Sequence, residues 1–159
     1  SYVADELPEI CREFFPNMSS AREDTYIAGL SMGGYGAFKI GMSRPERFSM
    51  AAALSGVMDV TLYGEKPEHR HIFGDTIRGT KNDLFTLATT LAESGKPKPE
   101  LFQWCGTEDS LYADNQAMRE HMDILKWPDY TYEEGPGGHK WSCWDEQIRR
   151  VLSWIKEGK

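Results

Sequence analysis

One serine lies in a segment whose residue types suit nucleophilic chemistry. Ser31 is flanked by Gly29 and Gly33, and it follows the short apolar run 25–30. That run predicts a β-strand and the small residues after Ser31 predict a helix, so the serine is expected on a sharp strand-to-helix turn. Side chains at positions 29 and 33 would collide with the neighbouring strand and helix, which explains the two glycines. Unpaired N–H groups at such a helix start favour negative charge on a reacting oxygen.

A Gly-x-Ser-x-Gly pattern alone is weak, since residue frequencies alone produce it in roughly one chain of this length in ten or twenty. The predicted strand before Ser31, the predicted helix after it, and the acid and histidine further along the chain strengthen the interpretation of Ser31 as a nucleophile. Ser43 and Ser55 lack flanking glycines and a strand-to-helix turn, so we interpret both as ordinary serines.

A carboxylate and an imidazole follow the next predicted strands in the order that a serine hydrolase needs. Asp109 comes just after the strand 98–105, and His139 lies in a glycine-rich loop after the strand 130–134. A serine hydroxyl needs a base to take its proton, and a carboxylate behind that base fixes its tautomer. We therefore predict Ser31 as nucleophile, His139 as general base and then acid, and Asp109 as the orienting acid. The backbone N–H of Met32 is the predicted oxyanion donor.

Other residues compete for these roles. Asp114 is the alternative acid, but it lies past the start of a predicted helix, where carboxylates commonly interact with the helix dipole. His121 falls inside a helix. His69 and His71 form an H-x-H pair without a third ligand, which is more often solvated than metal-bound. We predict no metal and no cofactor.

Composition narrows the class of protein. The 159 residues are 40% apolar and 27% charged, with a net charge of −7, which suits one globular domain and argues against nucleic-acid binding. Apolar runs are too short to cross a bilayer. Cys11, Cys105 and Cys143 are widely spaced, which argues against a zinc site and a disulfide framework and favours the cytoplasm. Secretion stays open, because the chain starts without a methionine.

Helices and strands alternate along the chain. Helical periodicity over 3–14, 82–93 and 113–125 alternates with the apolar strands, of which 48–56 is suited to burial on both faces. Residues 142–145 have the spacing of a capping box before a closing helix with Trp144 and Trp154 on its inner face. Trp104 is assigned to a strand, and Trp141 stays undecided. This alternation predicts a parallel sheet with its site at the carboxyl ends of the strands, and the irregular stretch 57–97 is expected to cover the site as a cap over the acyl pocket.

Four motifs make the chain similar to a known family. They are Gly-Leu-Ser-Met-Gly-Gly-Tyr-Gly-Ala at 29–37, Leu-Ser-Gly at 54–56, Cys-Gly-Thr-Glu-Asp at 105–109 and Gly-Gly-His-Lys-Trp-Ser-Cys-Trp-Asp at 137–145. They resemble the α/β-hydrolases of the esterase D and S-formylglutathione hydrolase group, and among them the tributyrin and acetyl esterases. The resemblance implies an α/β-hydrolase fold and a cofactor-free carboxylesterase for short acyl esters, with Ser31, Asp109 and His139 as its triad.

The family also has a segment that this sequence lacks. Early strands, one helix and the loop with the second oxyanion N–H precede the first helix in that group. We therefore expect residues 1–159 to be the C-terminal part of one hydrolase domain, with the missing N-terminal segment as a partner that completes the sheet. Alone, the chain should be a weak catalyst with an open sheet edge, and a homo-oligomer is possible.

Three functions agree with these residues. The first is a serine esterase acting on short acyl esters through an acyl-enzyme. The second keeps the triad but acts on S-formylglutathione or on acetylated or feruloylated carbohydrate. The third is a non-catalytic assembly module that retains the turn around Ser31.

Overall fold

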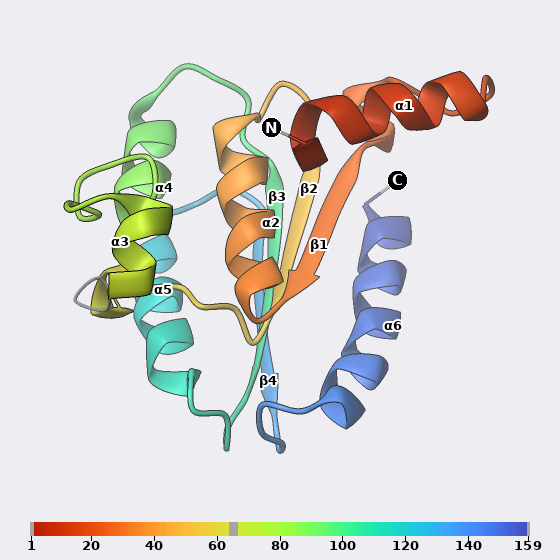
Figure 1. Ribbon diagram of the computed structural model, residues 1–159. Helices are drawn as coiled ribbons and strands as arrows, with labels where there is room; N and C mark the ends of the chain where they lie inside the picture. The colour runs from red at the N-terminus through yellow and green to blue at the C-terminus, as the bar shows by residue number, and fades with distance from the viewer. Residues whose placement is uncertain (1, 64–66, 159) are drawn as a thin grey trace.

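The computed structural model describes residues 2–63 and 67–158 and arranges them as one sheet between helical layers (Figure 1). The elements in chain order are η1 (Tyr2–Glu6), α1 (Leu7–Phe14), η2 (Arg22–Asp24), β1 (Tyr26–Leu30), α2 (Met32–Ser43), β2 (Met50–Leu54), η3 (Val60–Tyr63), α3 (Pro67–Phe73), α4 (Leu84–Glu93), β3 (Glu100–Gly106), α5 (Tyr112–Leu125), β4 (Tyr130–Gly135) and α6 (Trp141–Glu157).

The sheet has four parallel strands in the order β1-β2-β3-β4. Leu30 is in register with Leu54 and Leu54 with Trp104, so the strands end close to one level. Strand β2, which reads Met-Ala-Ala-Ala-Leu, is buried along its whole length, as expected for a central strand covered on both faces. The predicted α/β-hydrolase class, a parallel sheet with helices on both faces, is confirmed.

Two apolar cores hold the layers together. On one face α2, α4 and α5 pack over β2 and β3, with Phe38, Leu84 and Met118 fully buried. On the other face α6 covers the sheet, and its Trp144 and Trp154 pack with Phe102 and Trp104. Figure 1 shows α6 on one side of the sheet and the other three helices opposite it. Trp144 and Trp154 are core residues and Trp104 lies in a strand, as the sequence predicts.

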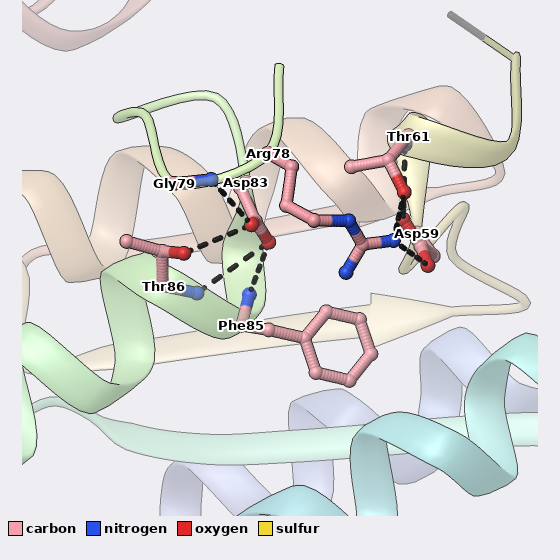
Figure 2. A network of polar contacts seen from close by, with 7 residues as sticks. All are labelled: Asp59, Thr61, Arg78, Gly79, Asp83, Phe85 and Thr86. Carbon is pink, nitrogen blue, oxygen red and sulfur yellow. Dashed lines mark hydrogen bonds and ion pairs between the residues drawn. The ribbon is translucent and has the colours of Figure 1, made fainter. Parts of the chain in front are cut away.

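The stretch 57–97 contains more regular structure than its sequence indicates. The predicted helix over 82–93 is present as α4, but η3 and α3 were not expected. Asp59 accepts hydrogen bonds from the backbone and hydroxyl of Thr61, and Arg78 contacts both residues (Figure 2). Asp83 starts α4 by accepting bonds from the backbone N–H groups of Phe85 and Thr86. Residues 64–66 lie outside the described part, and the cap role stays a prediction.

The two ends of the fold depart slightly from the sequence patterns. The N-terminal helical stripe begins as the π-helical turn η1 before it continues into α1, and Arg47 holds it by an ion pair to Asp5 at 2.9 Å. Helix α6 starts at Trp141 with Lys140 at its N-cap and no side-chain cap bond, so the capping box expected at 142–145 is wrong. Among the described residues, no helix has the length and apolar character needed to span a membrane.

Candidate active site

Ser31 adopts a strained backbone conformation immediately after β1. Its φ of 54° and ψ of −123° lie where non-glycine residues rarely occur. Backbone hydrogen bonds hold it there: its N–H donates to the carbonyl of Leu54 at 2.9 Å, and its own carbonyl accepts from the N–H groups of Gly34, Tyr35 and Val57. The backbone is thus fixed from both sides, which presents the hydroxyl at the carboxyl end of the sheet.

Glycine is required before this turn for a steric reason. A Cβ on Gly29 would lie 2.1 Å from the carbonyl oxygen of Gly33, a contact that no side chain tolerates. The same reason does not hold at Gly33, where a Cβ would meet nothing within 4 Å among the described residues, so that part of the prediction is wrong. The close approach is made instead by Gly34, whose Cβ would lie 2.9 Å from the Cα of Gly56.

The structure brings Ser31, His139 and Asp109 together. The Nε2 atom of His139 lies 2.9 Å from the Ser31 Oγ, and its Nδ1 atom lies 3.0 and 3.1 Å from the two carboxylate oxygens of Asp109. An ionised carboxylate only accepts, so Nδ1–H donates to Asp109 and Nε2 is free to accept from the serine hydroxyl. The Asp109 side chain is 0% exposed and that of His139 is 31% exposed, so the relay runs from the interior to the surface.

Backbone contacts between two turns set the acid against the base. In the turn after β3, the Thr107 N–H donates to the Gly135 carbonyl and the Glu108 N–H donates to the Gly137 carbonyl. Gly137 lies in the loop that carries His139. Gly106 is needed for this approach, because a Cβ there would lie 2.1 Å from the carbonyl oxygen of Gly137. The Leu111 N–H donates to Asp109 Oδ1 at 2.9 Å and orients the carboxylate further.

Met32 begins α2 directly after the serine. Within residues 2–63 and 67–158, no acceptor is found for its backbone N–H, and its side chain is exposed. A free N–H at a helix start points its dipole at neighbouring negative charge. This group is therefore available to a developing oxyanion beside Ser31.

A tryptophan supports the imidazole, which sequence reasoning did not anticipate. The rings of His139 and Trp144 meet in a T-shaped contact with centroids 4.8 Å apart. Trp144 packs in turn against Trp141, whose surface is 67% exposed. The spacing His-x4-Trp at the start of a helix was the available signal, but it was assigned to the core alone.

The competing residues lie elsewhere. The relay reaches Asp109 and not Asp114, whose Oδ2 atom is buried and has no hydrogen-bond partner among the described residues. Burial, together with the nearby charge of Asp59, raises the pKa of Asp114. His121 contacts the Thr89 hydroxyl and the Phe85 carbonyl on the helical layer, so it has a structural explanation.

The buried side chains of Ser55 and Cys105 are poorly suited to act as nucleophiles. Ser55 is fully buried, and burial with the nearby charge of Asp109 raises the pKa of the Cys105 thiol to about 12, which keeps it protonated. The described part of the chain contains no group of three or more His, Cys, Asp or Glu side chains arranged to hold a metal ion.

A family model matches nearly all of the chain. The model carries the description "Putative esterase" and covers residues 1–155. The chain belongs to this esterase family. It is 32% identical over 171 residues to an acetyl esterase of Caldicellulosiruptor saccharolyticus, covering 98% of the chain and 63% of the relative. It is 43% identical over 127 residues to an S-formylglutathione hydrolase of Paracoccus denitrificans, covering 79% of the chain and 39% of the relative.

Solved structures agree with this esterase assignment. The fluorophosphonate-binding serine hydrolase FphF of Staphylococcus aureus superposes with a TM-score of 0.87 at 31% identity, over 94% of the chain and 60% of its own. The S-formylglutathione hydrolase FrmB of the same organism gives a TM-score of 0.85 at 31% identity, over 94% of the chain and 61% of its own. The esterase chain thus spans less than two thirds of the length of these relatives.

Proposed function

We propose that the protein is a serine carboxylesterase that hydrolyses short-chain acyl esters through an acyl-enzyme. The observation that carries the proposal is the unbroken relay from Ser31 Oγ through His139 to buried Asp109. The esterase family and the acetyl esterase relative support the same reaction class.

The relay suggests a two-step mechanism. The Ser31 oxygen attacks the ester carbonyl carbon while its proton moves to Nε2 of His139, and the carbonyl oxygen becomes an oxyanion beside the Met32 N–H. Asp109 stabilises the imidazolium. His139 then gives the proton to the leaving alcohol oxygen as the C–O bond breaks, which leaves Ser31 acylated. In the second step a water molecule gives a proton to Nε2 of His139 while its oxygen attacks the acyl carbon. His139 then returns the proton to Ser31 Oγ as the bond between this oxygen and the acyl carbon breaks, which releases the carboxylic acid.

The experiment follows the first turnover. Mixing the protein with p-nitrophenyl acetate or butyrate should give a burst of p-nitrophenol equal to the active-site concentration, followed by slower hydrolysis. Ser31→Ala should abolish the burst, and Ser55→Ala, which changes a neighbouring buried serine, should retain it. Labelling by a fluorophosphonate probe should depend on His139. A burst that survives in Ser31→Ala would overturn the assignment.

S-formylglutathione is the second candidate substrate. The 43% identity to an S-formylglutathione hydrolase and the likeness to FrmB favour it. Its thioester carbonyl would pass through the same acyl-enzyme. Comparing kcat/KM for S-formylglutathione with that for p-nitrophenyl acetate and tributyrin on one preparation distinguishes the two functions, because an enzyme discriminates between substrates by the ratio of these constants.

We further propose that an additional segment of the same fold pairs one of its strands with β1 and supplies the second oxyanion donor from a loop. Strand β1 is an edge of the described sheet, and an apolar hollow of about 350 Å³ lies beside it, lined by Ala28, Leu30, Trp141 and Ile148. The intact mass of the protein purified from its native source tests this. An 18.1 kDa species with full activity and no companion polypeptide would contradict it.

For the location of the protein we propose the cytoplasm, where thiols stay reduced. Its support is that Cys11, Cys105 and Cys143 are all free thiols.

A further inference from the structure

Asn115 is the centre of a buried polar chain between β4 and the carboxyl end of the sheet. Its side chain lies in α5 and is fully buried. The Tyr130 hydroxyl donates to Gln103 Oε1 at 2.9 Å, and Gln103 Nε2 donates to Asn115 Oδ1 at 3.0 Å and to its backbone oxygen at 2.9 Å. Because Gln103 donates to Oδ1, the orientation of the Asn115 amide is fixed, with its NH2 group on the opposite side.

The NH2 group of Asn115 joins two loops that follow different strands. One N–H donates to the carbonyl of Gly56 at 2.9 Å and the other to the carbonyl of Leu111 at 2.8 Å. Gly56 follows β2 and Leu111 follows β3. Both protons of the amide are used, so the chain from Tyr130 to these two carbonyls is completely satisfied.

Each of these loops touches a different member of the catalytic relay. Gly56 lies directly against the start of α2, since a Cβ on Gly34 would be 2.9 Å from its Cα, and the next N–H, that of Val57, donates to the Ser31 carbonyl at 3.3 Å. Leu111 donates its N–H to Asp109 Oδ1. The Asn115 amide is therefore a direct tie between the loop that supports the nucleophile and the loop that orients the acid.

We propose that Asn115 is a positioning residue that sets the Asp109 turn relative to Ser31, an inference that rests on the proposed esterase function. Hydroxyl, imidazole and carboxylate must be aligned within a few tenths of an ångström for proton transfer in the transition state. A neutral amide with two donors suits this role, because it spans both carbonyls without adding charge beside the imidazolium. Substrate does not need to touch it.

Asn115→Ser is the most informative variant. A serine hydroxyl in a helix bonds the carbonyl four residues earlier, here that of Leu111, so this change keeps one tie and removes the one to Gly56. Asn115→Ala removes both. Tyr130→Phe is the matched control, since it leaves Gln103 Oε1 without its donor and destabilises the same chain at the end far from the relay.

The measurement is turnover per active site, titrated by the p-nitrophenol burst. We expect kcat to fall by about 10- to 100-fold in Asn115→Ala and less in Asn115→Ser, with KM within about twofold. We also expect the acid limb of the kcat/KM pH profile to move to lower pH, because a displaced carboxylate stabilises the imidazolium less. Tyr130→Phe should lower the thermal midpoint while it keeps kcat per site and the pH profile.

If the Asn115 variants only contain less folded protein, the number of titrated sites falls while kcat per site and the pH profile stay unchanged. That result would overturn the inference. If Asn115→Ala does not fold, Asn115→Ser decides by the same two readouts. A similar fall in kcat per site in Tyr130→Phe also overturns it. A wild-type chain without a Ser31-dependent burst is a separate failure, that of the esterase proposal itself.

Discussion

The Ser31 hydroxyl lies within hydrogen-bonding distance of the His139 imidazole, and the Ser31 backbone is strained. A non-glycine residue at a φ of 54° costs on the order of 1–3 kcal/mol, and it persists because Leu54, Gly34 and Val57 fix its peptide groups. The flanking glycines made this residue predictable from sequence. Asn115 was missed, although it lies in phase with Met118 and Met122 on the buried stripe of α5. A polar residue in such a stripe was the available signal, but only the fold shows which carbonyls it meets.

The first prediction concerns the acid of the relay. Asp109→Asn should lower kcat by roughly 10⁴-fold, because an amide nitrogen in place of a carboxylate oxygen favours the wrong imidazole tautomer. The control is Asp114→Asn, which changes the alternative acid and should leave kcat within a few-fold. Steady-state kinetics on p-nitrophenyl acetate check both. Equal losses in the two variants would show that the relay does not end at Asp109.

The second prediction concerns the backbone before Ser31. Gly29→Ala should destabilise the fold by about 3 kcal/mol or more, since its methyl group would lie 2.1 Å from the Gly33 carbonyl and both groups belong to the backbone. Gly36→Ala in the same segment meets nothing within 4 Å and should be neutral or stabilising, because alanine is the better helix former. Urea unfolding measures the stability of each of the two variants. Comparable midpoints for the two variants would contradict the steric argument.

At the scale of elements, helices and strands with a clear hydrophobic pattern could be predicted from the sequence. The four strands and the helices α4 and α5 lie within about two residues of their expected bounds, because each carries an apolar stripe or run long enough to recognise. Helix α3 and the turn η3 were missed, since the residues between 57 and 80 show no period. The position of η3 depends on contacts such as the Asp59–Thr61–Arg78 cluster in Figure 2, in which Arg78 comes from a later part of the chain.

The third prediction concerns the start of α4. Asp83 is buried, which by itself would raise its pKa, but hydrogen bonds from the Gly79, Phe85 and Thr86 N–H groups and the Thr86 hydroxyl outweigh burial and lower it. Asp83→Ala should therefore cost about 1–3 kcal/mol at pH 7. Asp75→Ala, in an exposed loop, should change stability by less than about 0.5 kcal/mol.

The pH dependence of the Asp83 effect has a definite sign. A carboxyl with a lowered pKa in the folded state contributes its full stability above its unfolded pKa of about 3.9 and loses it as the pH falls through the lower folded-state pKa. The gap between wild type and Asp83→Ala should accordingly narrow below about pH 4. Urea unfolding from about pH 5 to about pH 2 measures it, and a constant gap over that range would argue against a charged cap.

At the scale of the whole fold, the parallel sheet brings the candidate site residues together at one end, and β1 is an edge strand of the sheet that the described residues form. Ser31, Asp109 and His139 follow β1, β3 and β4 and meet because all strands point the same way. This convergence was predicted from the sequence, since alternating strands and helices indicate a parallel sheet with its site at the carboxyl ends of the strands. The T-shaped support of His139 by Trp144 could not be predicted, because it depends on how α6 is rotated over the sheet.

The open side of β1 leads to the last prediction. Ala28, in the middle of this edge strand, is exposed, and apolar hollows lie at both ends of the strand, one lined by Leu30 and Trp141 and one by Leu7 and Tyr26. An unpaired apolar edge is a template for another strand, so the 159-residue chain alone should self-associate as its concentration rises.

A charge on that edge should suppress the association, because pairing would bury it against a second apolar strand. Ala28→Lys should therefore keep the chain at its monomer mass of 18.1 kDa in sedimentation equilibrium, where the wild type exceeds it. Ile124→Lys is the matched control: it places the same charge on α5, where Ile124 is 77% exposed, and should leave the association unchanged. A wild-type chain that stays monomeric, or an equal effect of both lysines, would mean that β1 is not the surface that associates.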